Sequence, residues 1–404
     1  MLSVSEARAR ILSQFQTTTT EDISLMASSG RVLAADVTAT HELPPFDNSS
    51  MDGFAIRAED TDGSRLTLSV VADIPAGVAP QVTLATGQAA RIMTGAQMPP
   101  GADAVIPVED TDFNSREAGT AAPKTVSFER KVNAGENVRP QGMDLQAGQV
   151  VLKKGRTLKP QDLGLLAGLG ISNVEAFRQP RVALLSSGNE LIAVEQPLEA
   201  GKIHDSNSHV IAALIESSGA EAVRLGVAKD TRESVTALFE KAVAEKVDLI
   251  LSSAGVSVGA FDYIKEVIET QGKMDFWRVN MRPGKPLAFG TYRGINFIGL
   301  PGNPVSAFVG FEVFVRDVLH KLSGRSDGTR LRIKVRCAEE IESDGRESYL
   351  RATLHEENGI QMASLTGHQG SGNLLSLVQA DALLIIPAGV KCVPAGQEVE
   401  AILL

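Results

Sequence analysis

The chain has 404 residues, of which 43% are hydrophobic and 22% charged, as in ordinary globular proteins with about two to four domains. A net charge of −10 and an aromatic content of 4% argue against a non-specific nucleic-acid binder, which needs basic surface and stacking platforms. Cys337 and Cys392 are too few for a thiolate zinc site, and we expect two buried free thiols, with a single disulfide as the alternative. Because we find neither a signal-peptide core nor a membrane span, we expect a cytoplasmic protein without membrane contact.

The first part of the chain combines helical segments with a β-rich module. Apolar residues at helical spacing predict an amphipathic helix near the N-terminus, and a second, shorter helix is expected over residues 21–37. Short strands bounded by Gly and Pro turns predict a mostly β module over residues 41–145. A Pro-initiated helix follows at 159–171. We group residues 1–40 and 146–179 as a helical linker segment beside that module.

Strands and helices alternate through residues 180–325. The apolar strands "RVALL", "AVRLGVA" and "VDLILSS" each precede a helix, and Asp230 with Glu233 has the spacing of a capping box at one helix start. A hairpin, "PLAFGTYRGINFIGL", and a long closing helix complete this part. The pattern predicts a central α/β/α domain with a mostly parallel sheet. Residues 326–404 alternate again and predict a small β barrel, with a sandwich as the alternative. The expected fold class is therefore multidomain α/β plus β.

In such a sheet, ligands bind at the carboxyl ends of the strands. The loops expected there concentrate polar side chains on one rim: Glu190, Asp230, Asp262, Arg278, Arg282, Lys285, Asn303 and Ser306. Three carboxylates beside two arginines and a lysine indicate a divalent cation together with a multiply charged oxyanion, because Mg²⁺ binds through few carboxylates while substrate phosphates complete its shell.

Each of these signals has an ordinary structural explanation when taken alone. Asp230 and Asp262 precede helices and could be N-caps, and "SSAGVSVG" (252–259) fits neither common phosphate-loop spacing. "LPGNP" could be a rigid turn with Pro304 at the first helical position. "LPPFDNSSMDGFA" (43–55) is explained by an Asx-rich turn, and "GHQGSG" has no evident acid partner for a hydrolase triad. The clustering on one rim favours a functional site.

Nine stretches, in this order along the chain, resemble one family, the molybdopterin molybdenumtransferases, and are similar to the E domain of gephyrin. They are "PPFDNSSMDGFA", "RIMTGAQMPPGADAVIPVED", "NVRPQGMDLQAGQVV", "RVALLSSGNEL", "GKIHDSNS", "SSAGVSVGAFDY", "RVNMRPGKPLAFG", "LPGNPVSA" and "GHQGSGNLLSL". The resemblance implies a molybdopterin-binding central domain and transfer of molybdenum from molybdate into adenylylated molybdopterin, with Mg²⁺ as cofactor and release of AMP. It also implies an elongated homodimer with the site between subunits. The upstream adenylyltransferase and molybdoenzyme-maturation proteins are expected partners.

The family motifs assign roles to residues of this chain. As implied catalytic groups we carry over Asp262, Asp230, Glu190, Arg282, Arg278 and Asp52, the first three also as metal ligands. As implied substrate-binding groups we carry over Thr94, Asp144, Asp205, Ser206, Gly255, Ser257, Gly259, Lys285, Pro301, Asn303, Pro304 and Ser371. Asp52, Thr94 and Asp144 are expected to come from the facing module of a partner copy.

This chain departs from the family pattern at several positions. Arg278 and Arg282 stand where lysines are frequent, and an arginine fork differs in reach and geometry from an ammonium. Asn189 replaces a common aspartate, Ala254 a glycine, and His204 an aromatic phenol.

Two other functions remain open from the sequence. The central domain also resembles adenylyltransferases and other nucleotide-processing enzymes, and gephyrin-like proteins also act as scaffold dimers. ATP consumption would distinguish an adenylyltransferase from the molybdenumtransferase, because the molybdenumtransferase is expected to release AMP without consuming ATP.

Overall fold

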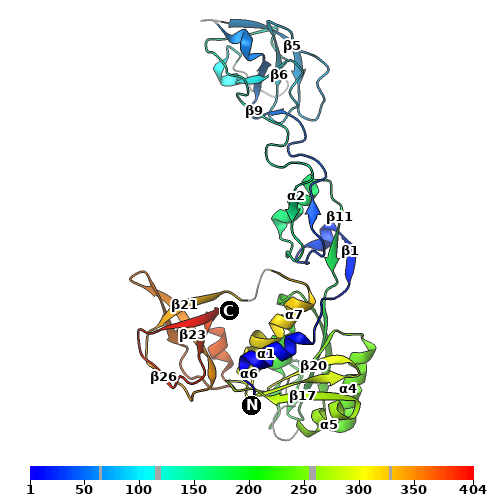
Figure 1. The fold of residues 1–404 in the computed structure, drawn as a ribbon, viewed down its shortest axis with the longest axis vertical. Coiled ribbons are helices and arrows are strands. Elements are labelled where there is room, and N and C mark those ends of the chain that lie inside the picture. The colour runs from blue at the N-terminus through cyan, green and yellow to red at the C-terminus, as the bar shows by residue number, and fades with distance from the viewer. Residues whose placement is uncertain (63–65, 114–119, 254–260, 327–329) are drawn as a thin grey trace. The chain divides into compact units, whose positions relative to one another are not determined.

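The computed structural model describes residues 1–62, 66–113, 120–253, 261–326 and 330–404, except for the side chains of Phe261, Asp262 and Trp277. The chain forms two compact units. The first contains residues 1–35, 154–163 and 173–404, and the second contains residues 36–153 and 164–172. Figure 1 shows the ribbon of both.

The first unit is built on a six-stranded sheet in the order β15-β12-β16-β20-β19-β17. The first four strands in that order are parallel, and β19 and β17 continue it as antiparallel neighbours. The expected strands and the hairpin are confirmed, whereas β17 was not expected as a strand. The bounds are β12 (Arg181–Ser187), β15 (Glu221–Ala228), β16 (Leu249–Ser253), β17 (Gly272–Arg278), β19 (Pro286–Tyr292) and β20 (Ile295–Leu300).

Helices cover both faces of this sheet, so the expected α/β/α layering is confirmed. Along β12, Val182 and Leu184 pack in one core with the N-terminal helix, α3 and the closing helix, while Ala183 and Leu185 pack with α4 and α5 in the other. This alternation follows from the period of two along a strand. The helices are α1 (Val4–Ser13), α3 (Ser206–Ser217), α4 (Arg232–Ala244) and α5 (Phe261–Gln271). The closing helix runs through α6 (Pro304–Gly310), the π-helical η4 (Phe311–Val315) and α7 (Arg316–Leu322).

The C-terminal residues close into a small barrel. Strands β23, β24, β21, β27 and β25 pair in turn, and β25 pairs back to β23, which confirms the barrel and excludes the sandwich. The short β18 (Met281–Arg282) of the central domain adds to β23 in parallel. The barrel strands are β21 (Arg332–Cys337), β23 (Glu347–Glu357), β24 (Ile360–Leu365), β25 (Ala382–Ile386) and β27 (Glu398–Leu403), and the short elements are β22 (Ile341–Glu342), β26 (Cys392–Val393) and α8 (Leu374–Val378).

Two expectations about this unit are wrong. The second N-terminal helix is instead β1 (Thr20–Ser24), followed by the 3₁₀ turn η1 (Leu25–Ser28), because β11 (Asn173–Phe177) supplies a pairing partner from far along the chain. Cys392 is an exposed thiol, whereas Cys337 is buried as expected. The helix predicted at 159–171 is confirmed as α2 (Pro160–Gly168).

The second unit contains the predicted β module. Its main sheet has the order β7-β4-β6-β5-β8, and two short pairs, β3–β9 and β2–β10, accompany it. The bounds are β2 (Val37–Thr38), β3 (Asn48–Ser49), β4 (Gly53–Ile56), β5 (Leu66–Ile74), β6 (Gln88–Ile92), β7 (Ala104–Pro107), β8 (Thr125–Phe128), β9 (Val138–Arg139) and β10 (Val150–Leu152), with 3₁₀ turns η2 (Ala58–Thr61) and η3 (Val108–Asp110).

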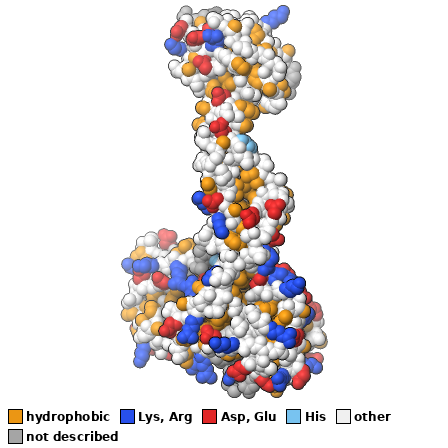
Figure 2. All heavy atoms as spheres, turned by 45° about the vertical axis from the view of Figure 1, so that its right-hand side comes forward, with side chains coloured by type: hydrophobic (Ala, Val, Ile, Leu, Met, Phe, Trp, Pro, Cys, Tyr) orange, Lys and Arg blue, Asp and Glu red, His pale blue; other side chains and the backbone are white. Residues whose placement is uncertain are grey.

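Charged side chains of both signs are intermixed on the face of the molecule seen in Figure 2. Within the described ranges, no helix combines the length and the apolar character needed to cross a membrane.

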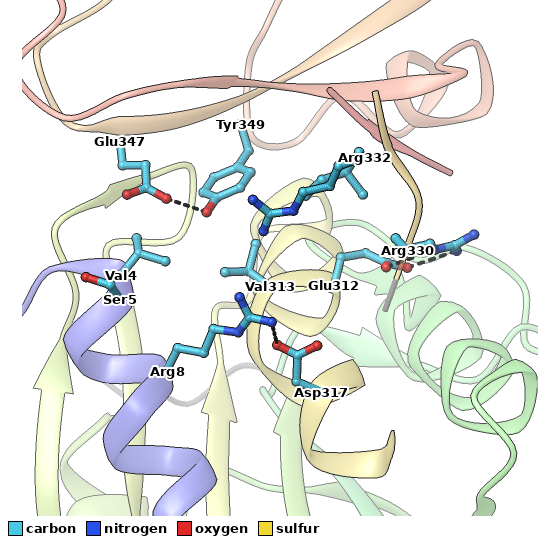
Figure 3. Close-up of a pocket in the computed structure, with 11 residues that line it drawn as sticks. Val4, Ser5, Arg8, Glu312, Val313, Asp317, Arg330, Arg332, Glu347 and Tyr349 are labelled. Atoms are coloured by element: carbon cyan, nitrogen blue, oxygen red, sulfur yellow. Dashed lines mark hydrogen bonds and ion pairs between the residues drawn. The ribbon is translucent and has the colours of Figure 1, made fainter. Parts of the chain in front are cut away.

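A charged junction joins α1, the closing helix and the barrel (Figure 3). Arg8 pairs with Asp317, and Glu312, whose side chain is 0% exposed, receives two bonds of 2.7 Å from Arg316 and two of 3.2 Å from Arg330. Burial by itself raises the pKa of Glu312, but the hydrogen bonds from Arg316 and Arg330 outweigh it and hold the pKa below its ordinary value of 4.5. Glu312 is therefore a buried anion whose charge stabilises the fold.

We expect Glu312→Gln to lower the free energy of unfolding of this unit by about 3 kcal/mol at pH 7, because two guanidinium groups lose their buried counter-charge. A lowered carboxyl pKa stabilises the fold above the ordinary pKa of 4.5, and this contribution is lost as pH falls through the folded-state pKa. The difference from the parent should thus shrink below about pH 4.5. Urea unfolding of parent and variant, at pH 7 and again below about pH 4.5, measures this difference in the free energy of unfolding. The exposed, ion-paired Glu269→Gln serves as control, and an equal loss in both variants would contradict the prediction.

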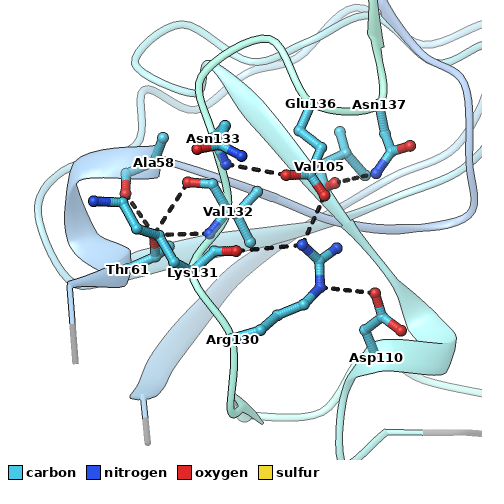
Figure 4. A network of polar contacts seen from close by, with 10 residues as sticks. All are labelled: Ala58, Thr61, Val105, Asp110, Arg130, Lys131, Val132, Asn133, Glu136 and Asn137. Atoms are coloured by element: carbon cyan, nitrogen blue, oxygen red, sulfur yellow. Dashed lines mark hydrogen bonds and ion pairs between the residues drawn. The ribbon is translucent and has the colours of Figure 1, made fainter. Parts of the chain in front are cut away.

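In the second unit a polar network holds the segment around Lys131 against η2 (Figure 4). The buried Thr61 hydroxyl donates to the Ala58 carbonyl at 2.7 Å and accepts from the Val132 N–H at 3.1 Å. Arg130 bridges Asp110 and Glu136 at 2.9 and 2.7 Å. The network replaces strand pairing in this segment.

Thr61→Val should cost about 1–3 kcal/mol of stability, because it leaves a buried N–H of Val132 without its acceptor while preserving side-chain shape. Thermal unfolding compares it with Thr67→Val, where the hydroxyl pairs with Ser127 at the surface. Equal transition midpoints for the two variants would show that the Thr61 bond contributes nothing.

Candidate functional site

The carboxyl ends of β12, β15, β16 and β20 lie at one edge of the central sheet, because these strands are parallel. The loops after β12, β15 and β20 are residues 188–190, 229–231 and 301–303, so the structure brings these predicted segments to one rim. β17 ends and β19 begins at the same edge, since each runs antiparallel to its neighbour. The tertiary arrangement of this rim follows from the strand directions alone.

Asp230 and Asn189 join two of these loops. The Asn189 N–H donates to Asp230 Oδ2 at 3.1 Å, and the Asp230 N–H donates to Asn189 Oδ1 at 3.2 Å. The cap of α4 is Thr231, whose hydroxyl accepts from the Ser234 N–H, so the expected capping box on Asp230 is wrong by one residue. Asp230 Oδ1 is buried and has no hydrogen-bond partner among the described residues. A carboxylate oxygen left in this state suits a cation.

Glu190 lies over the backbone of Gly188. Gly188 has φ of 153°, and a Cβ there would meet Glu190 Oε2 at 2.7 Å. The glycine of "SSGNE" is therefore required for the carboxylate to approach the end of β12.

A pocket of about 350 Å³ opens beside Glu190. Asp205 caps α3 by accepting from the Ser208 N–H at 3.1 Å, and Asn207 donates to the Gly302 carbonyl at 2.7 Å. The pocket contains seven of the predicted residues, Glu190, Asp205, Ser206, Pro301, Asn303, Pro304 and Ser306. It also contains residues that were not predicted as ligands: Leu191, Ile203, His204, Asn207, Ser253, Pro286 and Gly302.

The turn "LPGNP" starts α6, with Asn303 as the N-cap residue and Pro304 as the first helical residue. The Asn303 side chain makes no capping hydrogen bond within the described helix start, and Asn303 lines the pocket. The Val305 N–H donates at 3.0 Å to the carbonyl of Ser371, which brings the loop "GHQGSG" of the barrel domain to this helix start.

The predicted cations lie at the last residue of β17 and on the segment that connects β17 to β19. Arg278, Arg282 and Lys285 are exposed, and none of them lines the pocket. Arg282 Nη1 lies 3.7 Å from Asp344 Oδ2, whereas Arg278 and Lys285 form no ion pair within the described part of the chain. Strand β18 fixes the Arg282 backbone against β23, in register with Ser348.

A functional candidate that the sequence reasoning missed is Arg351 on β23. Its side chain is 0% exposed; Nε donates to Ser376 Oγ at 3.0 Å, and Nη2 donates to the carbonyls of Gly370 at 3.0 Å and His368 at 3.4 Å. Nη1 is buried without a partner among the described residues, and no described carboxylate pairs with the guanidinium. Burial, followed by the nearby charge of Arg282, lowers the pKa of Arg351. The sequence signal that could have identified Arg351 is a charged residue between the apolar residues of "SYLRATL".

The stretch containing Gly255, Ser257 and Gly259 lies outside the described residues. Asp262 is the second residue of α5, and its side chain is likewise not described. Asp52, Thr94 and Asp144 belong to the second unit. Asp52 Oδ1 accepts at 2.7 Å from both the N–H and the hydroxyl of Thr94, and Asp144 is exposed.

Three family profiles match successive parts of the chain. They are the MoeA N-terminal region (domain I and II) over residues 2–170, the probable molybdopterin binding domain over 183–321, and the MoeA C-terminal region (domain IV) over 334–404. The matches span nearly the whole chain and follow the order of the elements described above.

Curated relatives and a solved structure agree with these profiles. A molybdopterin molybdenumtransferase of Nostoc is 40% identical over 94% of this chain and 88% of its own, and one of Haemophilus influenzae is 37% identical over 99% and 98%. The crystal structure of a molybdopterin biosynthesis MoeA protein from Pyrococcus horikosii covers 100% of this chain and 99% of its own, with 32% identity and a TM-score of 0.85. The chain therefore belongs to the molybdopterin molybdenumtransferase family, whose members are transferases of molybdenum cofactor biosynthesis.

Proposed function

We propose that this protein inserts molybdenum from molybdate into adenylylated molybdopterin in a Mg²⁺-dependent reaction that releases AMP. The observation that carries the proposal is a pair of oppositely charged side chains, each with a buried atom that lacks a hydrogen-bond partner among the described residues. Asp230 Oδ1 lacks a hydrogen-bond donor, and Arg351 lacks a carboxylate partner, in both cases within the described residues. The carboxylate can bind a cation and the guanidinium can bind an anion. Together they complement a substrate that combines a pyrophosphate, a metal ion and an oxyanion.

In this proposal the pocket beside Glu190 holds the pterin nucleotide. Its mixed lining offers the Asn303 and Asn207 amides, the Ser206 hydroxyl and apolar contacts from Leu191 and Ile203. Such a mixture of apolar walls with a few polar groups is typical of sites that orient a small molecule.

The residues present fit a magnesium ion. Among the described residues, Asp230 Oδ1 is buried without a hydrogen-bond partner, and Glu190 lines the neighbouring pocket. No three His, Cys, Asp or Glu side chains of the described ranges form a metal-binding group by themselves. Mg²⁺ characteristically takes one or two carboxylates and completes its shell with substrate phosphates and water, so Asp230 and Glu190, with Asp262, would hold it jointly with the nucleotide. Bound there, the ion would neutralise the charge of the phosphoanhydride.

We propose that Arg282 and Arg351 bind molybdate. Guanidinium N–H groups match the oxygens of a tetrahedral oxyanion, and Arg351 already has its other donors fixed by Ser376 and the 368–370 loop. Arg278 and Lys285 add positive charge to the same segment. A homodimeric state, a cytoplasmic location and exchange with an upstream adenylyltransferase complete the proposal.

The reaction is tested by incubating the protein with adenylylated molybdopterin, molybdate and Mg²⁺ and measuring AMP. Asp230→Asn should lower AMP release about 100-fold, because the metal stabilises transition-state charge by several kcal/mol. Glu233→Gln, a nearby carboxylate on α4, should leave AMP release unchanged. Absence of AMP with the parent protein would overturn the proposed function, and ATP consumption would favour the adenylyltransferase alternative.

Arg351→Met should weaken molybdate binding about tenfold or more, because hydrogen bonds to a charged group contribute about 1.5–3 kcal/mol. Calorimetric titration with molybdate measures this. Arg336→Met, an exposed arginine of the same barrel, is the matched control. Unchanged affinity in a folded Arg351→Met variant would remove Arg351 from the oxyanion site while leaving the reaction itself untouched.

A further inference from the structure

The two arginines of the proposed oxyanion site differ in their counter-charges. Arg351 is fully buried and has no carboxylate partner among the described residues. The Arg282 side chain is 46% exposed and lies 3.7 Å from Asp344, which is itself 36% exposed. Of these two arginines, only the exposed Arg282 therefore has a carboxylate beside it within the described residues.

Asp344 is held mainly by another residue. Arg346 donates to Asp344 Oδ2 from Nη2 at 2.5 Å and from Nε at 3.0 Å, and its backbone N–H donates to Oδ1 at 3.1 Å. Arg346 Nη1 also donates at 3.2 Å to the carbonyl of Met281, the residue before Arg282. Hydrogen bonds from Arg346 lower the pKa of Asp344, so the carboxylate keeps its charge at neutral pH.

This arrangement permits Arg282 to leave Asp344 at little cost. Its contact with Asp344 is long, whereas Arg346 continues to neutralise the carboxylate when Arg282 moves. Because Arg346 is also tied to the Met281 carbonyl, the backbone of Arg282 stays in place during that movement.

Building on the proposed function, we propose that Asp344 is the internal counter-ion of the oxyanion site: it holds Arg282 while the site is empty and yields it to an incoming tetrahedral dianion. Asp344 is a positioning residue that acts through Arg282. Its negative charge lowers oxyanion affinity, both by competing for the guanidinium and by repelling the ligand. Because repulsion is proportional to ligand charge, the affinity for a dianion is lowered more than the affinity for a monoanion.

The test is calorimetric titration of the full-length protein with molybdate, a tetrahedral dianion, and with perrhenate, a tetrahedral monoanion. Asp344→Asn should bind molybdate about two- to fivefold more tightly, the range expected when an exposed ion pair is removed. The gain for perrhenate should be smaller, because repulsion scales with ligand charge. Asp344→Glu, which keeps the charge, should restore parent affinities.

Glu398→Gln is the matched control, because it removes one carboxylate of an exposed barrel ion pair with Lys334 and changes the net charge equally. A merely structural Asp344 would give weaker molybdate binding in Asp344→Asn, and that result would overturn the inference. Equal gains for molybdate and perrhenate would also overturn it. If Arg351→Met leaves molybdate affinity unchanged, the proposed oxyanion site fails; if it weakens binding while Asp344→Asn has no effect, only the role of Asp344 fails.

Discussion

The proposed oxyanion site depends on one short strand pairing. β18 leaves the central domain and adds to barrel strand β23, with Met281 opposite Glu347 and Arg282 opposite Ser348. The same junction is tied by the bond from Arg346 to the Met281 carbonyl and by the bond from Val305 to Ser371. Arg282 and Arg351 come from different domains, so the proposed oxyanion site exists only when central domain and barrel are folded against each other.

The buried carboxylate of Glu312 and two buried charged groups of the candidate site differ in their hydrogen bonds. Glu312 is surrounded by hydrogen bonds from Arg316 and Arg330, as a buried ion requires. Arg351 Nη1 and Asp230 Oδ1 are buried without such partners among the described residues. Leaving a polar group unpaired costs free energy, and this cost is tolerated where a ligand supplies the missing partner.

Local patterns predicted most of the central domain, because each helix there shows its own apolar stripe and each strand its own apolar run. They failed for residues 21–37, where the pairing of β1 with β11 outweighs local propensity. The capping box was misplaced because Thr231 and Asp230 are both good caps and only the backbone conformation distinguishes them.

The sequence by itself determined the family, the order of α/β and β modules, and the rim carrying Glu190, Asp230 and the "LPGNP" turn, since parallel strands must end at one edge. Only the tertiary structure revealed Arg351 and Asp344. The burial of Arg351, its missing counter-ion and the sharing of Asp344 by two arginines depend on residues that are far apart in the chain. Local sequence spacing cannot predict such contacts. The barrel likewise required the pairing of β25 with β23, a long-range contact that alternation alone could not distinguish from a sandwich.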